Sequence, residues 1–484
     1  MKVDELLEAS GGRLLYGKND TILGALVLSS KEVKKGDCFV AVKGENNDGN
    51  CFIEEAIENG ASVILSDRHP VIYDGLYGLV ERIHNGNVSF VLVENIYEAV
   101  KRAAKYYREK YLEKVVAVTG SVGKTTVKEL IYSVLSERMD IYKTEGNKNN
   151  HLGLPISIIS GKKSKNAVFE LGISNFGEMK ELSLISAPNV SVVTNIGSAH
   201  IEFLLSRENI ADEKLKIISG MKKDGALIIN GDEPLLTAFK NKSEGVFSVS
   251  ENSDTAVKII SVSEKDQNAD YFVGNVSFYD SGTFFDVYKQ GKILYKGLFV
   301  PIMGRHGAFD AAIAVAVGEF FECNEKNIRS GLKKFTPCGD RQRLENIGGI
   351  SCIFDCYNAS PEAFSASLDA LNILADRKKA TGKAVVAGSM LELGKGSEKA
   401  HKKIGEKIAQ VSPELLITVG KEAQDIAEGA KESGMKEENI ISFPENFHLE
   451  AVAEEIKKRL PRGSLLLIKG SRALKLERLR EYLK

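Results

Sequence analysis

The chain has 484 residues, and its 65 basic and 66 acidic side chains leave a formal net charge of −1. This balance excludes the large positive surface of a nucleic-acid-binding protein, and the length is enough for about three globular domains. The longest run of small apolar residues, 311–317, is too short to cross a bilayer, and the first residues lack the apolar core of a signal peptide. The 6 cysteines form no Cys-x-x-Cys pair. We therefore expect a cytoplasmic protein with reduced cysteines.

A small α/β unit is predicted over residues 1–112, where short apolar runs alternate with helical patterns and turn-forming residues. In chain order, the predicted elements are a strand over 38–42, a polar loop over 43–49, a helix over 52–59 that Gly60 ends, a strand over 62–65 and a helix over 96–111. The polar loop could bind a diphosphate, although such a loop more often only connects its neighbours.

A phosphate-binding loop is predicted at the start of a second unit, over 113–335. The apolar run 115–118 predicts a strand, a glycine-containing turn follows, and a helical pattern begins at Lys124. Backbone N–H groups left free at such a turn point at one spot, where the helix dipole is positive. Lys124 adds a charge for the β- and γ-phosphates of ATP, and Thr125 adds a hydroxyl for Mg²⁺. The predicted nucleotide-binding residues of this loop are Thr119, Gly120, Ser121, Val122, Gly123, Lys124, Thr125 and Thr126.

One residue departs from the usual phosphate-loop pattern, because Val118 stands where the first glycine is normally found, five places before Gly123. The alternative interpretation is an ordinary glycine turn between a strand and a helix. The order Gly-Lys-Thr-Thr behind an apolar strand favours phosphate binding over that alternative.

Two further polar side chains are expected close to this loop. Glu170 lies near the end of a predicted strand over 168–172, and His200 follows one over 190–195. Because parallel strands gather ligands at their carboxyl ends, both side chains should converge on the loop. The other predicted elements of the unit are a helix over 209–219 that carries Lys214, a strand over 226–230, a β-rich region over 245–300 and a helix over 307–321.

A third unit is predicted over 336–484, where strand and helix patterns alternate regularly. The predicted strands cover 350–354, 384–387, 415–419, 440–443 and 464–468, and the predicted helices cover 361–374, 397–410, 422–432, 450–460 and 474–483. This alternation indicates a doubly wound sheet. No Gly-x-Gly-x-x-Gly motif follows the first strand, which argues against a nicotinamide cofactor.

Several motifs in a fixed order extend over nearly the whole chain. They lie at 36–44 with 48–49, at 119–126, at 146–150 with 153–155, at 355–361, at 390–394 and at 469–472. On these motifs the chain resembles the Mur ligases, ATP-dependent amide-forming enzymes of peptidoglycan synthesis. The resemblance implies an α/β protein with three domains: a small α/β domain over 1–112 that binds a UDP-sugar substrate, a central P-loop domain with a parallel sheet over 113–335 that binds ATP, and a Rossmann-like doubly wound domain over 336–484.

The activity implied is that of the branch that joins D-alanyl-D-alanine to UDP-N-acetylmuramoyl-tripeptide. ATP would phosphorylate the terminal carboxylate of the tripeptide, and the amine of the dipeptide would attack the acyl phosphate. A monomer is expected. Three alternatives stay open: a paralogue that joins a different amino acid or dipeptide, a folylpolyglutamate synthase, and a catalytically silent nucleotide-binding scaffold. The N-terminal unit and the segment 355–361 favour the Mur branch over the second.

The resemblance also implies roles for single residues. Thr125 and Glu170 would hold one Mg²⁺, while His200 and Lys214, with the lysine carbamylated, would serve a second metal ion. The implied catalytic set is Lys124, Glu170, His200, Lys214, Asn147 and Arg343. The less specific expectations are Asn147 and Asn150 at the acyl phosphate, Arg343 neutralising phosphate, Asp355 at the ribose, and Lys469, Ser471 and Arg472 facing the dipeptide or the acyl substrate.

The chain departs from the family pattern at a few positions, which are Asn50, Ser174, Asn175, Asp310 and Ser389. Asp310 stands where asparagine is usual, and an ionised carboxylate only accepts hydrogen bonds, so it could accept from the adenine amino group. None of the departures removes the predicted phosphate and metal ligands. They therefore bear on which substrates are joined rather than on the chemistry.

Overall fold

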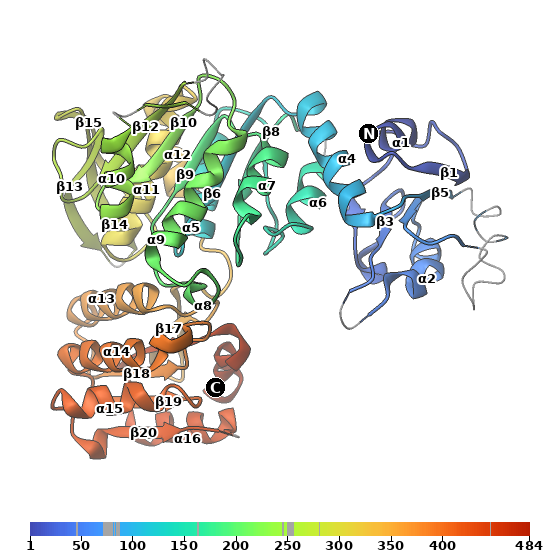
Figure 1. The fold of residues 1–484 in the computed structure, drawn as a ribbon. Helices are drawn as coiled ribbons and strands as arrows, with labels where there is room; N and C mark the ends of the chain where they lie inside the picture. Colours follow the sequence, from blue (N-terminus) through green and yellow to red (C-terminus); the bar gives the residue numbers. More distant parts are fainter. Residues whose placement is uncertain are drawn as a thin grey trace.

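The structure is a computed structural model that describes residues 1–44, 47–70, 81, 83, 88–161, 164–243, 246–248, 256–279, 281–445 and 447–484. Three sheets follow one another along the chain, and helices cover each of them (Figure 1). The N-terminal sheet (blue) and the C-terminal sheet (orange to red) flank different sides of the central one. In the described ranges, no helix combines the length and the apolar character that a membrane span requires.

The N-terminal sheet has five strands in the order β1-β5-β4-β3-β2, with β1 antiparallel to β5 and the other neighbours parallel. Its elements are α1 Val3–Ser10, β1 Arg13–Tyr16, β2 Leu26–Val27, β3 Cys38–Ala41, α2 Ile53–Glu58, β4 Val63–Ser66 and β5 Ser89–Leu92. The predicted strands and helix are confirmed. Gly60 follows α2 with φ 104°, a left-handed conformation that favours glycine and ends the helix. Residues 45 and 46 of the predicted polar loop lie outside the described residues.

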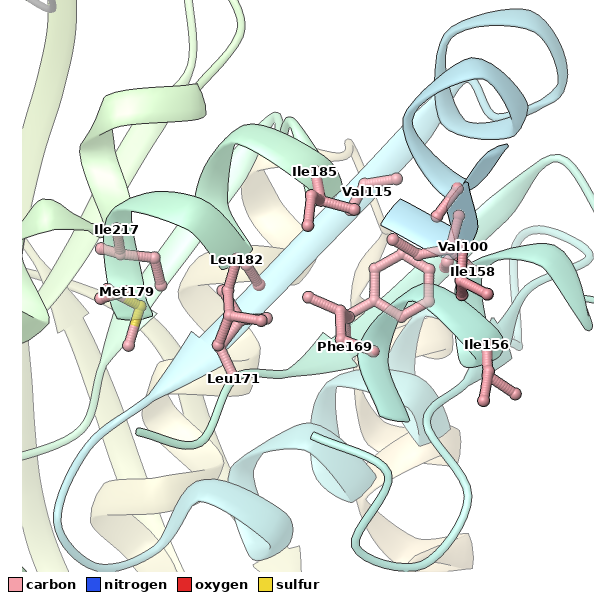
Figure 2. Packing of buried hydrophobic residues seen from close by; sticks show 14 of the residues in the cluster. Val100, Val115, Ile156, Ile158, Phe169, Leu171, Met179, Leu182, Ile185 and Ile217 are labelled. Carbon is pink, nitrogen blue, oxygen red and sulfur yellow. The ribbon is translucent and has the colours of Figure 1, made fainter. Parts of the chain in front are cut away.

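Helix α4, Ile96–Tyr111, joins the first unit to the second, and its predicted bounds are confirmed. Asn95 caps it by accepting from the backbone N–H groups of Tyr97 and Glu98. One apolar cluster extends from the N-terminal sheet through α4 into the central unit. Figure 2 shows part of it, with Val100 of α4 beside Ile158 and Phe169 of the central unit. This shared core fixes the two units to each other.

The central sheet has ten strands. Nine follow the order β15-β14-β13-β12-β10-β9-β6-β8-β7, and β11 pairs with β12. The strands from β7 to β12 along this path run parallel, whereas β13, β14 and β15 form an antiparallel meander. The elements are β6 Lys114–Thr119, α5 Lys124–Leu135, β7 Tyr142–Lys143, α6 Gly153–Ile159, β8 Asn166–Glu170, α7 Glu178–Ser186, β9 Val190–Val193, α8 Ile201–Leu204, α9 Arg207–Leu215, β10 Ala226–Asn230, α10 Pro234–Lys242, β11 Val246–Ser248, β12 Ala256–Ser263, β13 Tyr271–Tyr279, β14 Gly282–Lys289, β15 Lys292–Val300, α11 Arg305–Phe320 and α12 Glu325–Lys334.

The central predictions are largely confirmed. The strand before the phosphate loop, the helix that starts at Lys124 and the strand β10 lie where the sequence predicts them. The β-rich stretch resolves into β11 to β15, apart from residues 245, 249–255 and 280, which lie outside the described residues. Strands β6, β8 and β9 are neighbours, so their carboxyl ends meet at one edge of the sheet.

The C-terminal sheet has six strands in the order β16-β17-β21-β18-β19-β20, with β16 antiparallel and the others parallel. Its elements are β16 Arg343–Ile347, β17 Ile350–Asp355, α13 Pro361–Lys378, β18 Lys383–Gly388, α14 Ser397–Val411, β19 Leu415–Val419, α15 Gln424–Glu432, β20 Ile440–Phe443, α16 Leu449–Arg459, β21 Leu465–Lys469 and α17 Leu479–Tyr482. Apolar clusters cover both faces, which confirms the doubly wound arrangement.

Two details of this unit differ from the prediction. The edge strand β16 was not predicted, because its residues are half-buried or exposed and show no continuous apolar run. The prediction of one continuous helix over 474–483 is wrong. Lys475 has φ 51°, and short 3₁₀ turns replace the first part of the helix. Leu474 and Leu476 both pack near Gly388, whereas residues two apart in an α-helix point in nearly opposite directions.

Replacing Arg108 with methionine is expected to lower the melting temperature by about 5 °C, a destabilisation of about 2 kcal/mol. Arg108 is 2% exposed on α4, and it donates to the carbonyl oxygens of Ser186 at 2.8 Å, Ala187 at 2.7 Å and Leu112 at 2.5 Å. Methionine would leave these buried acceptors without their donor. Thermal denaturation measures the effect, with Lys105→Met on the exposed face of the same helix as control. Equal melting temperatures for the two variants would contradict the conclusion that the buried hydrogen bonds of Arg108 stabilise the fold.

Candidate active site

The phosphate loop lies between β6 and α5, and two glycines shape it. Gly123 takes φ 83° at the start of α5, and a Cβ atom on Gly120 would lie 1.9 Å from Thr194 Oγ1. Asn195 Oδ1 accepts from the N–H groups of Ser121 at 3.0 Å and Val122 at 2.8 Å. Asn195 therefore braces the first half of the loop, and the N–H groups at the start of α5 remain to bind an anion.

Two lysines meet at one carbonyl of this loop. Lys124 Nζ donates to Gly120 O at 2.7 Å, and Lys214 Nζ, from α9, donates to the same oxygen at 3.2 Å. Burial lowers the pKa of Lys214 well below its usual value, and the neighbouring charge of Lys124 lowers it further. Burial also lowers the pKa of Lys124, although the carboxylate of Glu170 opposes that shift. A buried amine beside a half-buried one favours an anionic ligand.

Glu170, at the end of β8, lies against the first turn of α5. Its Oε2 atom accepts from Thr125 Oγ1 at 2.8 Å, and its side chain is only 4% exposed. Its Oε1 atom accepts from Asn149 Nδ2 at 2.8 Å, and the buried Lys128 Nζ lies 3.8 Å from Oε2. The structure thus brings together the two predicted ligands of the first metal ion. The sequence analysis did not single out Asn149 or Lys128.

His200 lies just beyond β9 in a left-handed conformation, with φ 62°. Its Nδ1 atom is 2.8 Å from Glu392 Oε2, which belongs to the C-terminal unit. Burial lowers the pKa of His200, the carboxylate of Glu392 opposes this, and the charges of Lys124 and Lys214 lower it further. The imidazole and both lysines therefore share one electrostatic environment.

Most of the predicted residues line one cleft of about 2190 Å³ between the central and C-terminal units. Those that do are Ser121, Val122, Gly123, Lys124, Thr125, Thr126, Asn147, Asn150, Glu170, His200, Asp310, Arg343, Asp355, Lys469 and Arg472. Asn147 is exposed, and Asn150 Oδ1 accepts from the backbone N–H of Gly153, the first residue of α6, at 2.8 Å. Thr119 is fully buried under the loop, where its hydroxyl donates to Leu171 O.

The arginines at positions 341 and 343 differ in their surroundings. Arg343 is exposed at the start of β16 and pairs with Glu345 at 2.8 Å. Arg341, which the sequence analysis did not select, donates from Nη2 to Thr125 Oγ1 at 3.0 Å. Both side chains line the cleft, but Arg341 is the one that contacts the phosphate loop. The sequence around positions 341 and 343 contains no signal that distinguishes the two arginines.

Asp355 and Lys469 form a buried pair at the ends of β17 and β21. Lys469 Nζ is 2.6 Å from Asp355 Oδ2, and it is 1% exposed. Ser367 Oγ also donates to Asp355 Oδ2, at 2.5 Å. Lys469 is therefore engaged inside the C-terminal unit, although both residues line the cleft. Ser471 accepts from the N–H of Leu391 at 3.0 Å and braces the loop that carries Glu392.

The positions that depart from the family pattern have local partners. Asn50 is 1% exposed and accepts from Ser66 Oγ at 2.7 Å, while Ser389 accepts from Ala423 N at 3.2 Å. The N–H groups of Ser174 and Asn175 donate to the side chain of Glu178. Asp310, on α11, faces the loop, with its Oδ1 atom 3.5 Å from where a Cβ atom on Gly123 would lie. Burial raises the pKa of Asp310 to about 8.

The Asp310→Asn variant is expected to be more stable than the parent at pH 8 and to match it more closely at pH 5. The folded state keeps the Asp310 proton up to about pH 8, whereas an unfolded aspartate releases it near pH 4. The parent therefore loses stability as the pH rises between those values, by up to a few kcal/mol, and the asparagine variant does not. Melting temperatures of both proteins from pH 5 to pH 8.5 measure the difference. A constant difference over that range would contradict the protonated carboxyl.

Family comparison accounts for the three units in order. The model of the Mur ligase family catalytic domain matches residues 25–116, the Mur ligase middle domain matches 118–318, and the Mur ligase glutamate ligase domain matches 342–472. Among solved structures, MurF from Acinetobacter baumannii superposes with a TM-score of 0.82 at 25% identity, covering 100% of this chain and 98% of that one. MurF ligase from Thermotoga maritima in complex with ADP gives 0.77 at 28% identity, covering 96% and 98%.

Curated relatives agree with these matches. The UDP-N-acetylmuramoyl-tripeptide–D-alanyl-D-alanine ligase of Bacillus subtilis (strain 168) is 33% identical over 94% of this chain and 92% of its own length. The ligase of the same name from Rickettsia prowazekii (strain Madrid E) is 30% identical and covers 94% of both chains. Three family models in chain order, together with relatives that match along nearly the whole length, show that this chain belongs to the Mur ligase family.

Proposed function

We propose that the chain is an ATP-dependent, ADP-forming ligase that adds D-alanyl-D-alanine to UDP-N-acetylmuramoyl-tripeptide in peptidoglycan synthesis. The names of its relatives support the two substrates. The observation that carries the chemistry is the cluster at the phosphate loop. There Lys124 and Lys214 share the carbonyl of Gly120, and Thr125 bonds to Glu170. This cluster offers positive charge and oxygen ligands to the same triphosphate.

The reaction needs this charge because both reacting groups are anions. A carboxylate oxygen of the tripeptide attacks the γ-phosphorus of ATP, and ADP leaves with the electron pair of the broken bond. The amine of the dipeptide then attacks the acyl carbon and loses a proton, the amide bond forms, and phosphate leaves. Lys124 compensates the charge that develops on the transferred phosphate, and closing the cleft excludes water.

Mg²⁺ fits the oxygen pair of Thr125 and Glu170. In the described part of the chain no group of three or more His, Cys, Asp or Glu is arranged as a metal site. Mg²⁺ does not require one, since it keeps several waters and takes substrate phosphate oxygens beside one or two protein ligands. When bound, the ion would neutralise charge between the β- and γ-phosphates. We propose Thr125 and Glu170 as its ligands, with His200 serving a second ion.

Lys214 is proposed to carry a carbamate. Burial favours its neutral amine, which is the form that attacks CO₂. The new N–C bond makes a carbamate anion, and one proton is released to solvent. The anion would neutralise Lys124 beside it and supply an oxygen ligand for the second ion, whereas an unmodified ammonium would repel that ion.

We further propose that the three sheets correspond to domains over 1–112, 113–335 and 336–484. We propose a cytoplasmic location, because ATP and UDP-linked sugars are found there, and a monomeric enzyme; cell fractionation and gel filtration test the two proposals. A second ligase activity has weaker support. Folylpolyglutamate synthase of Mycobacterium tuberculosis has a TM-score of 0.59 at 15% identity, which reflects the fold alone.

A phosphate-release assay with the purified chain, ATP and Mg²⁺ tests the function. We expect release only when UDP-N-acetylmuramoyl-tripeptide and D-alanyl-D-alanine are both present, together with the amide product in the mass spectrum. Single amino acids and other dipeptides serve as matched acceptors. Release that ignores both substrates would contradict the proposal. Release with another acceptor only would identify a paralogue, and ATP binding without turnover would identify a silent scaffold.

A further inference from the structure

His401 is a buried histidine of the C-terminal unit that the proposed chemistry does not use. It belongs to α14, is 0% exposed, and lies against the β18–α14 loop, which comprises residues 389–396. Its Nε2 atom accepts from the backbone N–H of Met390 at 2.9 Å, and its Nδ1 atom lies 2.8 Å from Ser397 O. A backbone N–H only donates and a carbonyl oxygen only accepts, so Nε2 must be bare and Nδ1 must carry the proton. These two contacts select one neutral tautomer of the ring.

The surroundings of His401 favour this neutral form. Burial lowers the pKa of His401 below its usual value, and the bond to Ser397 O and the carboxylates of Asp425 and Glu422 oppose that shift without reversing it. Protonation would place an N–H on Nε2 against the N–H of Met390, so the imidazolium cannot keep this bond. The ring is therefore an acceptor for Met390 at neutral pH.

The β18–α14 loop contains a residue in an unfavourable backbone conformation. Glu392 has φ 64°, in the left-handed region that residues other than glycine rarely adopt. Such a conformation persists only where the surrounding contacts impose it. The two residues before Glu392 are held by side chains, since Met390 donates to His401 and Leu391 N donates to Ser471 Oγ at 3.0 Å. The bond to His401 is therefore one of the contacts that fix the place of Glu392.

Glu392 in turn meets His200 of the central unit. Its Oε2 atom is 2.8 Å from His200 Nδ1, and His200 also has a left-handed backbone, with φ 62°. A carboxylate beside one ring nitrogen sets the orientation of an imidazole and leaves the other nitrogen for a further contact. Both side chains line the cleft that contains the phosphate loop. The direction of the His200 ring thus depends on a carboxylate that the β18–α14 loop presents.

We infer that His401 is a positioning residue: by accepting from Met390 it holds the β18–α14 loop so that Glu392 orients the imidazole of His200 in the cleft. The link from His401 to His200 follows from these contacts alone. Its consequence for turnover rests on the proposed function, in which His200 serves a metal ion. His401 itself lines no part of the cleft and acts only through the loop.

Histidine ¹⁵N NMR of the full chain tests the link without any substrate. In the parent, His401 should show the tautomer with the proton on Nδ1, a result that needs no variant to fold. The ring signals of His200 should shift in His401→Phe and in Glu392→Ala. They should stay in place in His401→Gln, because an amide oxygen can accept from Met390 and a phenyl ring cannot. His448→Phe, at an exposed position of the same unit, is the matched control. A proton on Nε2 of His401, or His200 signals that ignore His401→Phe, would overturn the inference.

Ligase kinetics tests the consequence for turnover. His401→Phe is expected to lower kcat by at least about tenfold, because it leaves a buried N–H without its acceptor, and His401→Gln should recover most of that loss. The affinity for ADP, measured by calorimetry, should stay within about twofold of the parent in both variants, because the phosphate loop belongs to the other unit.

The double variant His401→Phe/Glu392→Ala separates positioning from general damage. If His401 acts through Glu392, the double variant turns over no more slowly than Glu392→Ala alone. Independent, multiplying losses, or a loss of ADP binding in His401→Phe, would overturn the positioning role. Failure of the ligase assay in a parent protein that shows the expected His401 tautomer and the expected His200 shifts would count against the proposed function only.

Discussion

Replacing Lys124 with alanine is expected to lower turnover by about three orders of magnitude. The ammonium group lies beside the phosphate loop, 2.7 Å from Gly120 O, and no other described side chain of the loop carries a positive charge. Without it, the charge that develops as the γ-phosphate is transferred loses its nearest compensation. The ligase assay at saturating ATP measures the effect on kcat, and calorimetry with ADP measures the effect on binding.

The melting temperature provides the matching control for Lys124→Ala. Burial disfavours the charged form of Lys124, so its removal should leave the melting temperature unchanged or slightly higher. A variant that unfolds more easily would show that the lysine holds the loop rather than the nucleotide. Lys124→Arg keeps the positive charge but replaces the compact ammonium with a larger, planar guanidinium. This variant should therefore recover ADP binding better than turnover. Near-parental turnover of the alanine variant would contradict the phosphate role.

Lys214→Ala is expected to lose at least about a hundredfold in turnover and to regain part of it in formate, acetate or propionate. The change removes a side chain that is 2% exposed and bonded to Gly120 O, and a small carboxylate can occupy the space with the charge of the lost carbamate. The parent protein equilibrated with ¹³C-bicarbonate should give a carbamate signal in its ¹³C NMR spectrum. That signal should be absent from the variant.

Lys223→Ala provides the comparison for this experiment. Lys223 lies nine residues beyond Lys214 and is exposed, so its loss should change neither turnover nor the carbamate signal. Unchanged activity of Lys214→Ala would show that the carbamate idea is wrong. Loss of activity that no carboxylate rescues, with no NMR signal in the parent, would leave Lys214 as a structural residue of the loop.

Long patterned elements were predictable from the sequence. Helix α4 has the predicted bounds of 96–111, because an Asn cap and a regular apolar face mark its start and its buried side. Strands β10, β19 and β20 also begin and end as predicted. The helix over 474–483 failed because Leu474 and Leu476 must both reach the sheet. This packing against Gly388 is a tertiary contact, and local helix propensity does not depend on it.

The sequence by itself determined the phosphate loop, the strand ends that carry Glu170 and His200, and the order of the three units, since chain-local spacing specifies each of them. Only the tertiary structure decided which neighbours contact the phosphate loop and Glu170. Arg341 rather than Arg343 contacts Thr125, and Asn149 rather than Asn147 contacts Glu170. The reason is directional: in irregular chain the directions of neighbouring side chains follow no fixed period, and only the folded backbone sets which of them faces the cleft.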